Sequence, residues 1–151
     1  MMDGSATLDD YPVRVTQQVR WSDVDMYGHV NNIVYYGWFD TAINTWLQRE
    51  AGIDPVTADA IGVVGESACS YESEVNLGDE VTVGLAVVTL GASSITYALA
   101  AFVGERRAAL GHWVHVYVAR DGSGVTAVPE EIARIAATAR GDVPQVVLRK
   151  L

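Results

Sequence analysis

The feature that most constrains how this chain can fold is one broadly apolar helical stretch between Asn31 and Gly52. Large apolar side chains recur there at helical spacing and cover one wide face of the predicted helix. That face holds Tyr35, Phe39, Ala42, Ile43, Trp46 and Leu47, and it is widened by Val34 and Trp38. Polar side chains are confined to a narrow stripe, so we expect other structure to enclose most of the helix.

The ends of this helix are marked by residues that favour helix termini. Asparagine is a strong N-cap, so the helix should begin at Asn31 or Asn32. It should end at about residues 48–50, before Gly52. Gly37 lies inside the predicted helix, where glycine costs about 1 kcal/mol relative to alanine. We expect another backbone to approach closely at Gly37.

The residues on either side of this helix predict strands. Apolar and polar side chains alternate over residues 11–21, which is typical of a half-buried strand. Four further strands are expected after Pro55, over residues 63–72, 79–90, 93–103 and 109–120. The last three follow one another through short glycine-containing links, which favours an antiparallel meander. Pro129 then opens a short helix that should stop at Gly141.

Together these elements predict an α+β fold. A five-stranded antiparallel sheet should wrap around one long buried helix, with a short C-terminal helix added. The chain of 151 residues suits one domain. We expect residues 1–11 to form a polar N-terminal arm and residues 12–151 to form the single domain. One sheet face covers only one side of the helix, so the remaining apolar width predicts a second subunit.

Composition excludes several classes of function. The net charge of −9 provides no general basic face, which argues against nucleic-acid binding. Cys69 is the only cysteine, so neither an internal disulfide nor a four-cysteine zinc site can form. The first residues show no secretory signal, and no apolar run reaches about 18 residues. We therefore expect a cytoplasmic protein that does not cross a membrane.

Other charged and metal-ligating side chains carry weaker signals. His112 and His115 are three residues apart on a predicted strand, so they should point to opposite faces and not share a metal. Glu66 and Glu72 are best interpreted as solvated strand residues. The pair at residues 106–107, two arginines, could meet a phosphate group, but a charged hairpin tip is the favoured interpretation.

The residues most suggestive of chemistry lie where the first strand meets the long helix. Asp23, Asp25 and His29 are concentrated there, and Gly28 permits a tight loop that can bring Asp25 and His29 near the helix N-terminus. That terminus carries free backbone N–H groups and a partial positive charge, which can polarise a carbonyl oxygen. A carboxylate facing it could attack the carbonyl or activate a water. Each of these side chains could instead stabilise the turn, and for Asp23 that interpretation is favoured.

This junction resembles a known family. The stretch Asp-Val-Asp-Met-Tyr-Gly-His-Val-Asn-Asn at residues 23–32 is similar to that of hotdog-fold acyl-CoA thioesterases of the 4-hydroxybenzoyl-CoA thioesterase type. It also resembles plant acyl-ACP thioesterases, although those carry an asparagine where this chain has Tyr27. The order of elements is similar over roughly residues 12–140.

The resemblance implies a hotdog fold and a site. The helix would be the "sausage" and the sheet the "bun", and subunits would form a homodimer or homotetramer with active sites at the dimer interface. Asp25 matches the catalytic carboxylate, which acts as nucleophile or general base. Asn32 matches the position whose backbone N–H polarises the thioester carbonyl, and His29 matches the histidine of the plant motif. The resemblance implies no metal or other cofactor.

We therefore predict an enzyme that hydrolyses an acyl-CoA thioester to free acid and CoA. Two alternatives stay open. A hydratase or dehydratase of the same fold would place its aspartate and histidine five residues apart around an Asn-Pro pair, whereas Asp25 and His29 are four apart with no proline between them. A non-catalytic acyl-CoA-binding module would bind the thioester without turnover.

Overall fold

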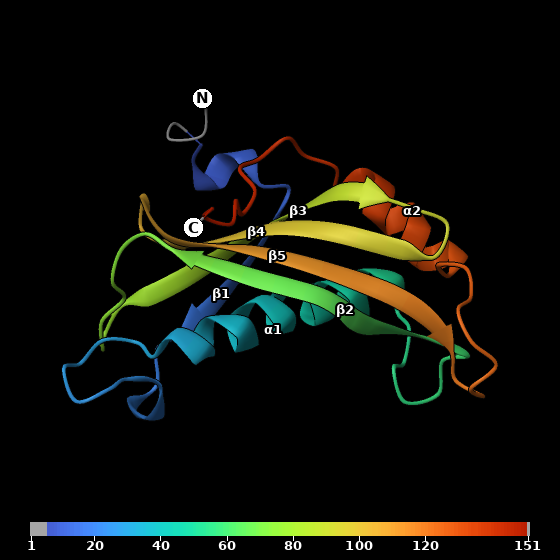
Figure 1. The fold of residues 1–151 in the computed structure, drawn as a ribbon, viewed down its shortest axis with the longest axis horizontal. Helices are drawn as coiled ribbons and strands as arrows, with labels where there is room; N and C mark the ends of the chain where they lie inside the picture. The colour runs from blue at the N-terminus through green and yellow to red at the C-terminus, as the bar shows by residue number, and fades with distance from the viewer. Residues whose placement is uncertain (1–5, 151) are drawn as a thin grey trace.

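The structure is a computed structural model that describes residues 6–150. Its regular elements follow the predicted order of strand, long helix, four strands and short helix (Figure 1). They are β1 (Val13–Gln18), α1 (Asn32–Ala51), β2 (Ala60–Tyr71), β3 (Glu80–Leu90), β4 (Ser94–Val103), β5 (Arg106–Ala119) and α2 (Glu130–Thr138). Two short 3₁₀ turns, η2 (Leu8–Asp10) and η3 (Trp21–Asp23), flank β1.

Helix α1 begins and ends where its capping residues predict. The side-chain oxygen of Asn31 accepts a hydrogen bond from the N–H of Ile33 at 3.3 Å. At the other end, Gly52 adopts a left-handed conformation with φ of 64°, and its N–H donates to the carbonyl of Gln48. Glycine reaches this conformation without steric cost, so the helix stops there.

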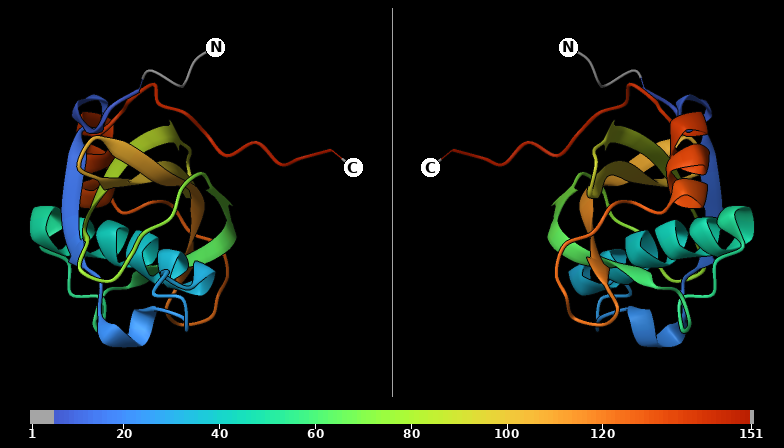
Figure 2. Two further views of the ribbon diagram at one scale, coloured as in Figure 1. Left: turned by 90° about the vertical axis from the view of Figure 1, so that its left-hand side faces the viewer. Right: turned by 90° about the vertical axis from the view of Figure 1, so that its right-hand side faces the viewer.

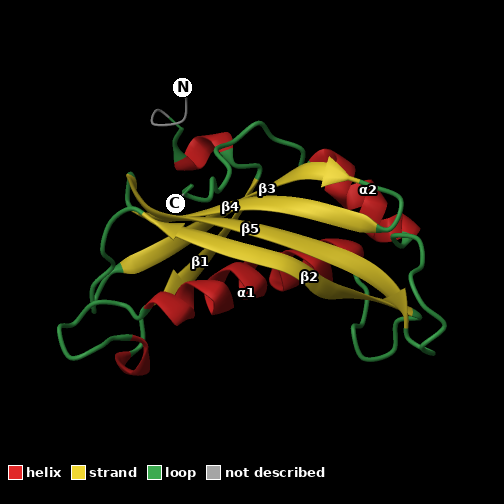
Figure 3. Ribbon diagram, in the orientation of Figure 1, coloured by secondary structure: helices red, strands yellow, loops and turns green. Residues whose placement is uncertain are grey.

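The five strands form one antiparallel sheet in the order β1-β3-β4-β5-β2 (Figure 3). Strands β3, β4 and β5 make the predicted meander. Within the described residues strand β2 pairs with β5 only, so its other side is a free edge of the sheet. The predicted fold is confirmed: a five-stranded antiparallel sheet, one long helix and a short C-terminal helix.

The main core lies between α1 and one face of the curved sheet (Figure 2). Phe39 is fully buried and points at Gly111 of β5, where a Cβ atom would lie 2.6 Å from the phenyl ring. A glycine is therefore needed for the helix to approach the sheet so closely. From α2, Ile132 and Ile135 pack into the same core and close one end of it.

A second, smaller cluster covers the opposite face of the sheet. Tyr11 is fully buried there against Phe102, with ring centroids 5.9 Å apart, and Val143 joins it from the C-terminal segment. Gly84 leaves the room that the Tyr11 ring occupies. The polar arm expected over residues 1–11 thus ends in a buried tyrosine, while its first five residues lie outside the described chain.

Several local expectations differ from the structure. Strand β1 covers only Val13–Gln18 of the predicted 11–21 stretch, and Trp21 begins the η3 turn instead. Strand β2 begins at Ala60 rather than residue 63, and β5 begins at Arg106, so the two arginines belong to the strand rather than to the turn. Among residues 6–150, no heavy atom outside the neighbouring helix backbone lies within 4 Å of a Cβ placed on Gly37, so no backbone of the described chain approaches it. No helix in the described part of the chain is long and apolar enough to cross a membrane.

Candidate active site

The loop before α1 is held in place by Asp23. The carboxylate accepts hydrogen bonds from the backbone N–H of Arg20 at 2.8 Å and from the Arg20 guanidinium at 2.9 Å. Burial opposes ionisation of this nearly inaccessible side chain, but the hydrogen bonds from Arg20 prevail and hold the Asp23 pKa below its usual value. Asp23 therefore stabilises the η3 turn, as the sequence favoured.

Asp25 lies on the exposed side of the same loop. Its Oδ1 atom accepts hydrogen bonds from the N–H groups of Tyr27 at 2.8 Å and His29 at 3.2 Å. The Asp25 N–H in turn donates to the His29 carbonyl at 2.8 Å. Both side-chain bonds use Oδ1, which orients the carboxylate on the loop while Oδ2 has no hydrogen-bond partner among residues 6–150.

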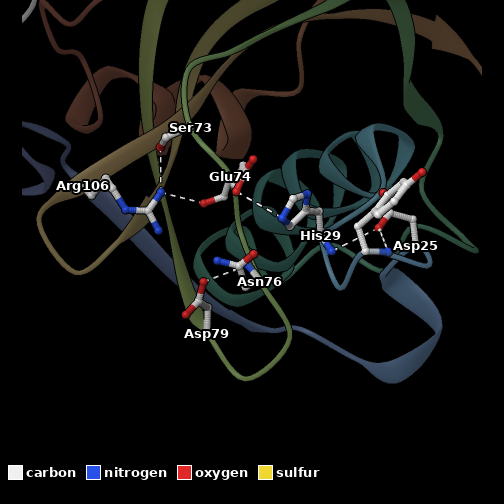
Figure 4. Close-up of polar contacts among 8 residues, drawn as sticks. Asp25, His29, Ser73, Glu74, Asn76, Asp79 and Arg106 are labelled. Atoms are coloured by element: carbon white, nitrogen blue, oxygen red, sulfur yellow. Dashed lines mark hydrogen bonds and ion pairs between the residues drawn. The ribbon is translucent and has the colours of Figure 1, made fainter.

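The imidazole of His29 faces away from Asp25 and toward the segment that follows β2. His29 Nε2 lies 3.2 Å from Glu74 Oε2. Figure 4 shows the resulting chain of contacts from Asp25 through His29 to Glu74, with Arg106 on the opposite side of Glu74 from His29. Arg106 donates to the Glu74 carbonyl at 2.6 Å and to the Ser73 hydroxyl at 2.7 Å, so it holds the segment that carries Glu74.

The first turn of α1 lies on the other side of His29. The N–H of Asn32 has no acceptor in the part of the chain that the structure describes, which is the usual state of a first helical residue. The Tyr71 hydroxyl donates to the Asn32 carbonyl at 3.1 Å, and the Tyr71 ring packs edge-on against Tyr35. The end of β2 is thereby fixed beside the helix start.

A pocket of about 280 Å³ opens between these elements. Its lining includes His29, Asn32, Tyr35, Tyr71 and Glu74. Asp25 does not line it, because its carboxylate lies on the outer side of the loop. Within one chain the structure therefore brings His29 and Asn32 to the same pocket. Asp25 lies outside this pocket and is connected to it by the hydrogen bond from the His29 N–H.

The segment of residues 72–79 is the part of the site that sequence reasoning missed. It lies along the 24–30 loop through backbone hydrogen bonds from Val30 to Val75 and from Leu77 to Gly28. The 106–107 pair, expected as a charged hairpin tip, directly follows the β4–β5 turn, and Arg107 binds Glu72 with an N–O distance of 2.6 Å. No local pattern predicts these pairings, because they join residues more than thirty positions apart.

The remaining candidate residues lie elsewhere. His112 and His115 point to opposite faces of the sheet: His112 pairs with Glu66 at 2.6 Å, whereas His115 is buried beneath α1. Cys69 packs against the main core, and burial raises the pKa of its thiol to about 11. Residues 6–150 contain no group of three or more His, Cys, Asp or Glu side chains that could hold a metal ion.

Comparisons with known proteins place the chain in a family. Residues 19–136 match the model of the thioesterase-like superfamily. The PA5185 protein of Pseudomonas aeruginosa is 38% identical, with a TM-score of 0.86, and the match covers 91% of this chain and 98% of that one. A Thermus thermophilus thioesterase, solved with coenzyme A and zinc, is 33% identical, with a TM-score of 0.71 over 82% and 96% of the two chains.

A Staphylococcus aureus protein, SAV2348, solved in complex with CoA, has the same fold. It is 18% identical, with a TM-score of 0.78, and the match covers 91% of this chain and 89% of that one. No curated protein matches. The family match spans most of the chain and includes both the 24–30 loop and the 72–79 segment of the candidate site. The chain therefore belongs to the thioesterase-like superfamily and has the hotdog fold.

Proposed function

We propose that this protein hydrolyses an acyl-CoA thioester to a free acid and CoA, in the manner of the 4-hydroxybenzoyl-CoA thioesterase type. The observation that carries the proposal is the pocket at the start of α1, where an unpaired helical N–H, His29 and the Asp25 loop meet. Family membership and the CoA complexes of the Thermus thermophilus and Staphylococcus aureus proteins support the thioester as substrate. No membrane or nucleic-acid step is involved, and the cytoplasm is the proposed location.

In this proposal the first turn of α1 polarises the substrate. The thioester carbonyl accepts a hydrogen bond from the Asn32 N–H, and the partial positive charge of the helix end favours the oxyanion that forms on attack. Because Tyr35, Trp38 and Phe39 bury one face of α1 in the core, this donor is held in place before the substrate binds. Removing one such donor typically costs about 10²–10³ in rate.

Asp25 supplies the negative charge for the reaction. Its Oδ1 atom is held by two backbone N–H groups, and the carboxylate lies outside the pocket of its own chain. The proposal therefore requires the thioester to bind at the edge of the pocket, across the 24–30 loop, where Oδ2 attacks the carbonyl carbon or accepts a proton from the attacking water. His29 belongs to the same loop, its imidazole is held by Glu74, and in this proposal it binds the thioester or a water inside the pocket. No step requires a metal or other cofactor.

We further propose that two copies of the chain pair along the free edge of β2, as a homodimer or as half of a homotetramer. Residues 62–67 of this strand are exposed, and their outward N–H and C=O groups have no strand partner among residues 6–150. Two apolar side chains, Val63 and Val64, are also exposed there. A second copy would pair these groups and enclose the pocket, because Tyr71 at the end of β2 lines it.

The test is thiol release from a panel of short, long, branched and aromatic acyl-CoAs. Asp25→Asn keeps an oxygen for the loop hydrogen bonds but removes the charge, and it should lower kcat by about 10²–10⁴. Asp121→Asn is the matched control, because Asp121 accepts from the N–H of Ser123 at 2.8 Å in the same kind of turn, far from the pocket.

Near-normal turnover by Asp25→Asn would overturn the role of Asp25. Binding of acyl-CoA without thiol release by the wild-type protein would overturn hydrolysis and favour the binding module. Loss of the enoyl absorbance of crotonyl-CoA, without thiol release, would favour a hydratase.

A further inference from the structure

A second pocket, of about 360 Å³, lies under the other half of α1. Its walls are mostly apolar and include Leu47, Ile53, Ile61, Tyr117 and Ile132. It does not share a lining residue with the pocket at the helix start. The nearest α1 residues that line the two pockets, Tyr35 and Asn44, are nine positions apart, which corresponds to about 13.5 Å along a helix axis, so within one chain the two pockets are separate.

One polar side chain is buried in the wall of this second pocket. His115 is only 2% exposed, and its Nδ1 atom has no hydrogen-bond partner among the described residues. Glycine lets the backbone of β2 lie close to that atom, because a Cβ at Gly62 would lie only 3.2 Å from Nδ1 and 3.1 Å from the Tyr117 ring. Buried polar atoms are nearly always paired, so an unpaired one that borders a cavity indicates a ligand contact.

The surroundings of His115 favour a neutral imidazole. Burial lowers the His115 pKa and Asp40 opposes that shift without overcoming it. The ring packs edge-on against Tyr97, with centroids 5.6 Å apart, so its orientation is fixed. A neutral imidazole offers one donor and one acceptor, which suits an uncharged hydroxyl or oxo group better than a carboxylate.

We propose that this pocket, here called the His115 pocket, receives an acyl group that has an apolar body and a hydroxyl or oxo group remote from the thioester, hydrogen-bonded to His115 Nδ1. A water-sized group occupies about 30 Å³, so the pocket volume of about 360 Å³ holds roughly a dozen heavy atoms. That size corresponds to a medium-length acyl chain. This inference rests on the proposed thioester hydrolysis.

The proposed dimer explains how the acyl group reaches this pocket. Residues 60–62, at the beginning of β2, line the His115 pocket, and Tyr71, at the end of β2, lines the pocket with Asn32. If two β2 edges pair antiparallel about the middle of the exposed stretch, the beginning of one strand lies beside the end of the other. The reaction centre of one subunit then adjoins the His115 pocket of the second.

The experiment compares hexanoyl-, octanoyl- and decanoyl-CoA with their ω-hydroxy counterparts, by kcat/KM for thiol release. The wild-type protein should prefer the hydroxylated member of at least one pair. His115→Phe keeps the ring against Tyr97 but removes the hydrogen-bonding atoms, and it should reduce that preference by about ten- to a hundredfold. Gly62→Ala, which places a methyl group beside Nδ1, should reduce it as well.

His112→Phe is the matched control, because His112 lies on the same strand but on the opposite sheet face, paired with Glu66. It should leave the preference unchanged. If His115 had only a structural role, His115→Phe would lower kcat/KM equally for both members of every pair. That result, or a wild-type protein with no preference in any pair, would overturn the inference, whereas no thiol release from any acyl-CoA would overturn the proposed function itself.

Discussion

At the scale of single residues, two aspartates of one loop have opposite environments. Asp23 is 2% exposed and bound on both oxygens by Arg20, whereas Asp25 is exposed and bound on Oδ1 alone. The difference follows from the path of the loop. Asp23, the last residue of η3, points inward, whereas Asp25 lies two residues further on at the protein surface. Stability depends on the first carboxylate, and the proposed chemistry depends on the second.

Asp23→Asn should lower the free energy of unfolding by about 1–3 kcal/mol at neutral pH, because a charged hydrogen-bond acceptor of Arg20 is lost. The Asp23 pKa is lowered by folding, so its stabilisation is complete above the unfolded-state pKa and is lost as the pH falls through the folded-state pKa. Urea unfolding should therefore show the wild type and variant converging in acid.

The exposed pair of Asp9 with Arg14, 3.7 Å apart, supplies the control for this measurement. Asp9→Asn should change stability by less than about 1 kcal/mol at any pH, because exposed ion pairs contribute little. If the difference in the free energy of unfolding between Asp23→Asn and the wild type stays constant down to strongly acid pH, the assigned role of the Asp23 charge is contradicted.

At the scale of elements, the approach of α1 to the sheet depends on where side chains are missing. Phe39 of the helix needs the space above Gly111, whereas the position of a Cβ at Gly37 meets nothing in the described chain. Packing thus requires glycine at position 111 but not at position 37, although both glycines lie inside a regular element. Only the tertiary contacts distinguish them.

Gly111→Ala should destabilise the protein by about 1–3 kcal/mol, because the Phe39 ring must move out of its place. Gly37→Ala is the matched comparison and should stabilise by up to about 1 kcal/mol through helix propensity. Thermal unfolding of both variants checks the pair. A destabilising Gly37→Ala would show that this helix surface is packed against something outside the chain.

At the scale of the whole molecule, the sheet ends in a free strand with an exposed centre. Strand β2 has a partner in β5 on one side only, and its residues 62–67 are exposed. Long, unprotected edges favour pairing with another chain. The two pockets lie near the two ends of this strand, so pairing of the edges and completion of the proposed site would be one event.

Replacing Val63 and Val64 together by lysine should convert the proposed dimer to a monomer, because like charges would face each other across the new strand pair. Light scattering after gel filtration measures the mass, and thiol release should fall with the loss of the dimer. Val125→Lys, at a residue that is also exposed but lies in a loop, should change neither. A wild-type monomer with full activity would refute the pairing.

Local periodicity was sufficient to predict most of the fold. The apolar face of α1 and its caps at Asn31 and Gly52 predicted the helix correctly, and the order of the strands followed from alternation and turns. The boundaries of β5 were less predictable, because Arg106 and Arg107 extend the strand through contacts with residues 72–74. Those contacts are non-local, so no pattern in the neighbouring sequence reports them.

The sequence by itself determined which elements form and which loop carries the carboxylates, because helix periodicity, strand alternation and capping are properties of neighbouring residues. Tertiary structure alone brought Tyr71 and Glu74 to the start of α1 and buried His115 beside Gly62. These groups meet because β2 and β5 pair antiparallel and curve around the helix. Such proximity is a property of the folded sheet, and no segment of the chain contains it alone.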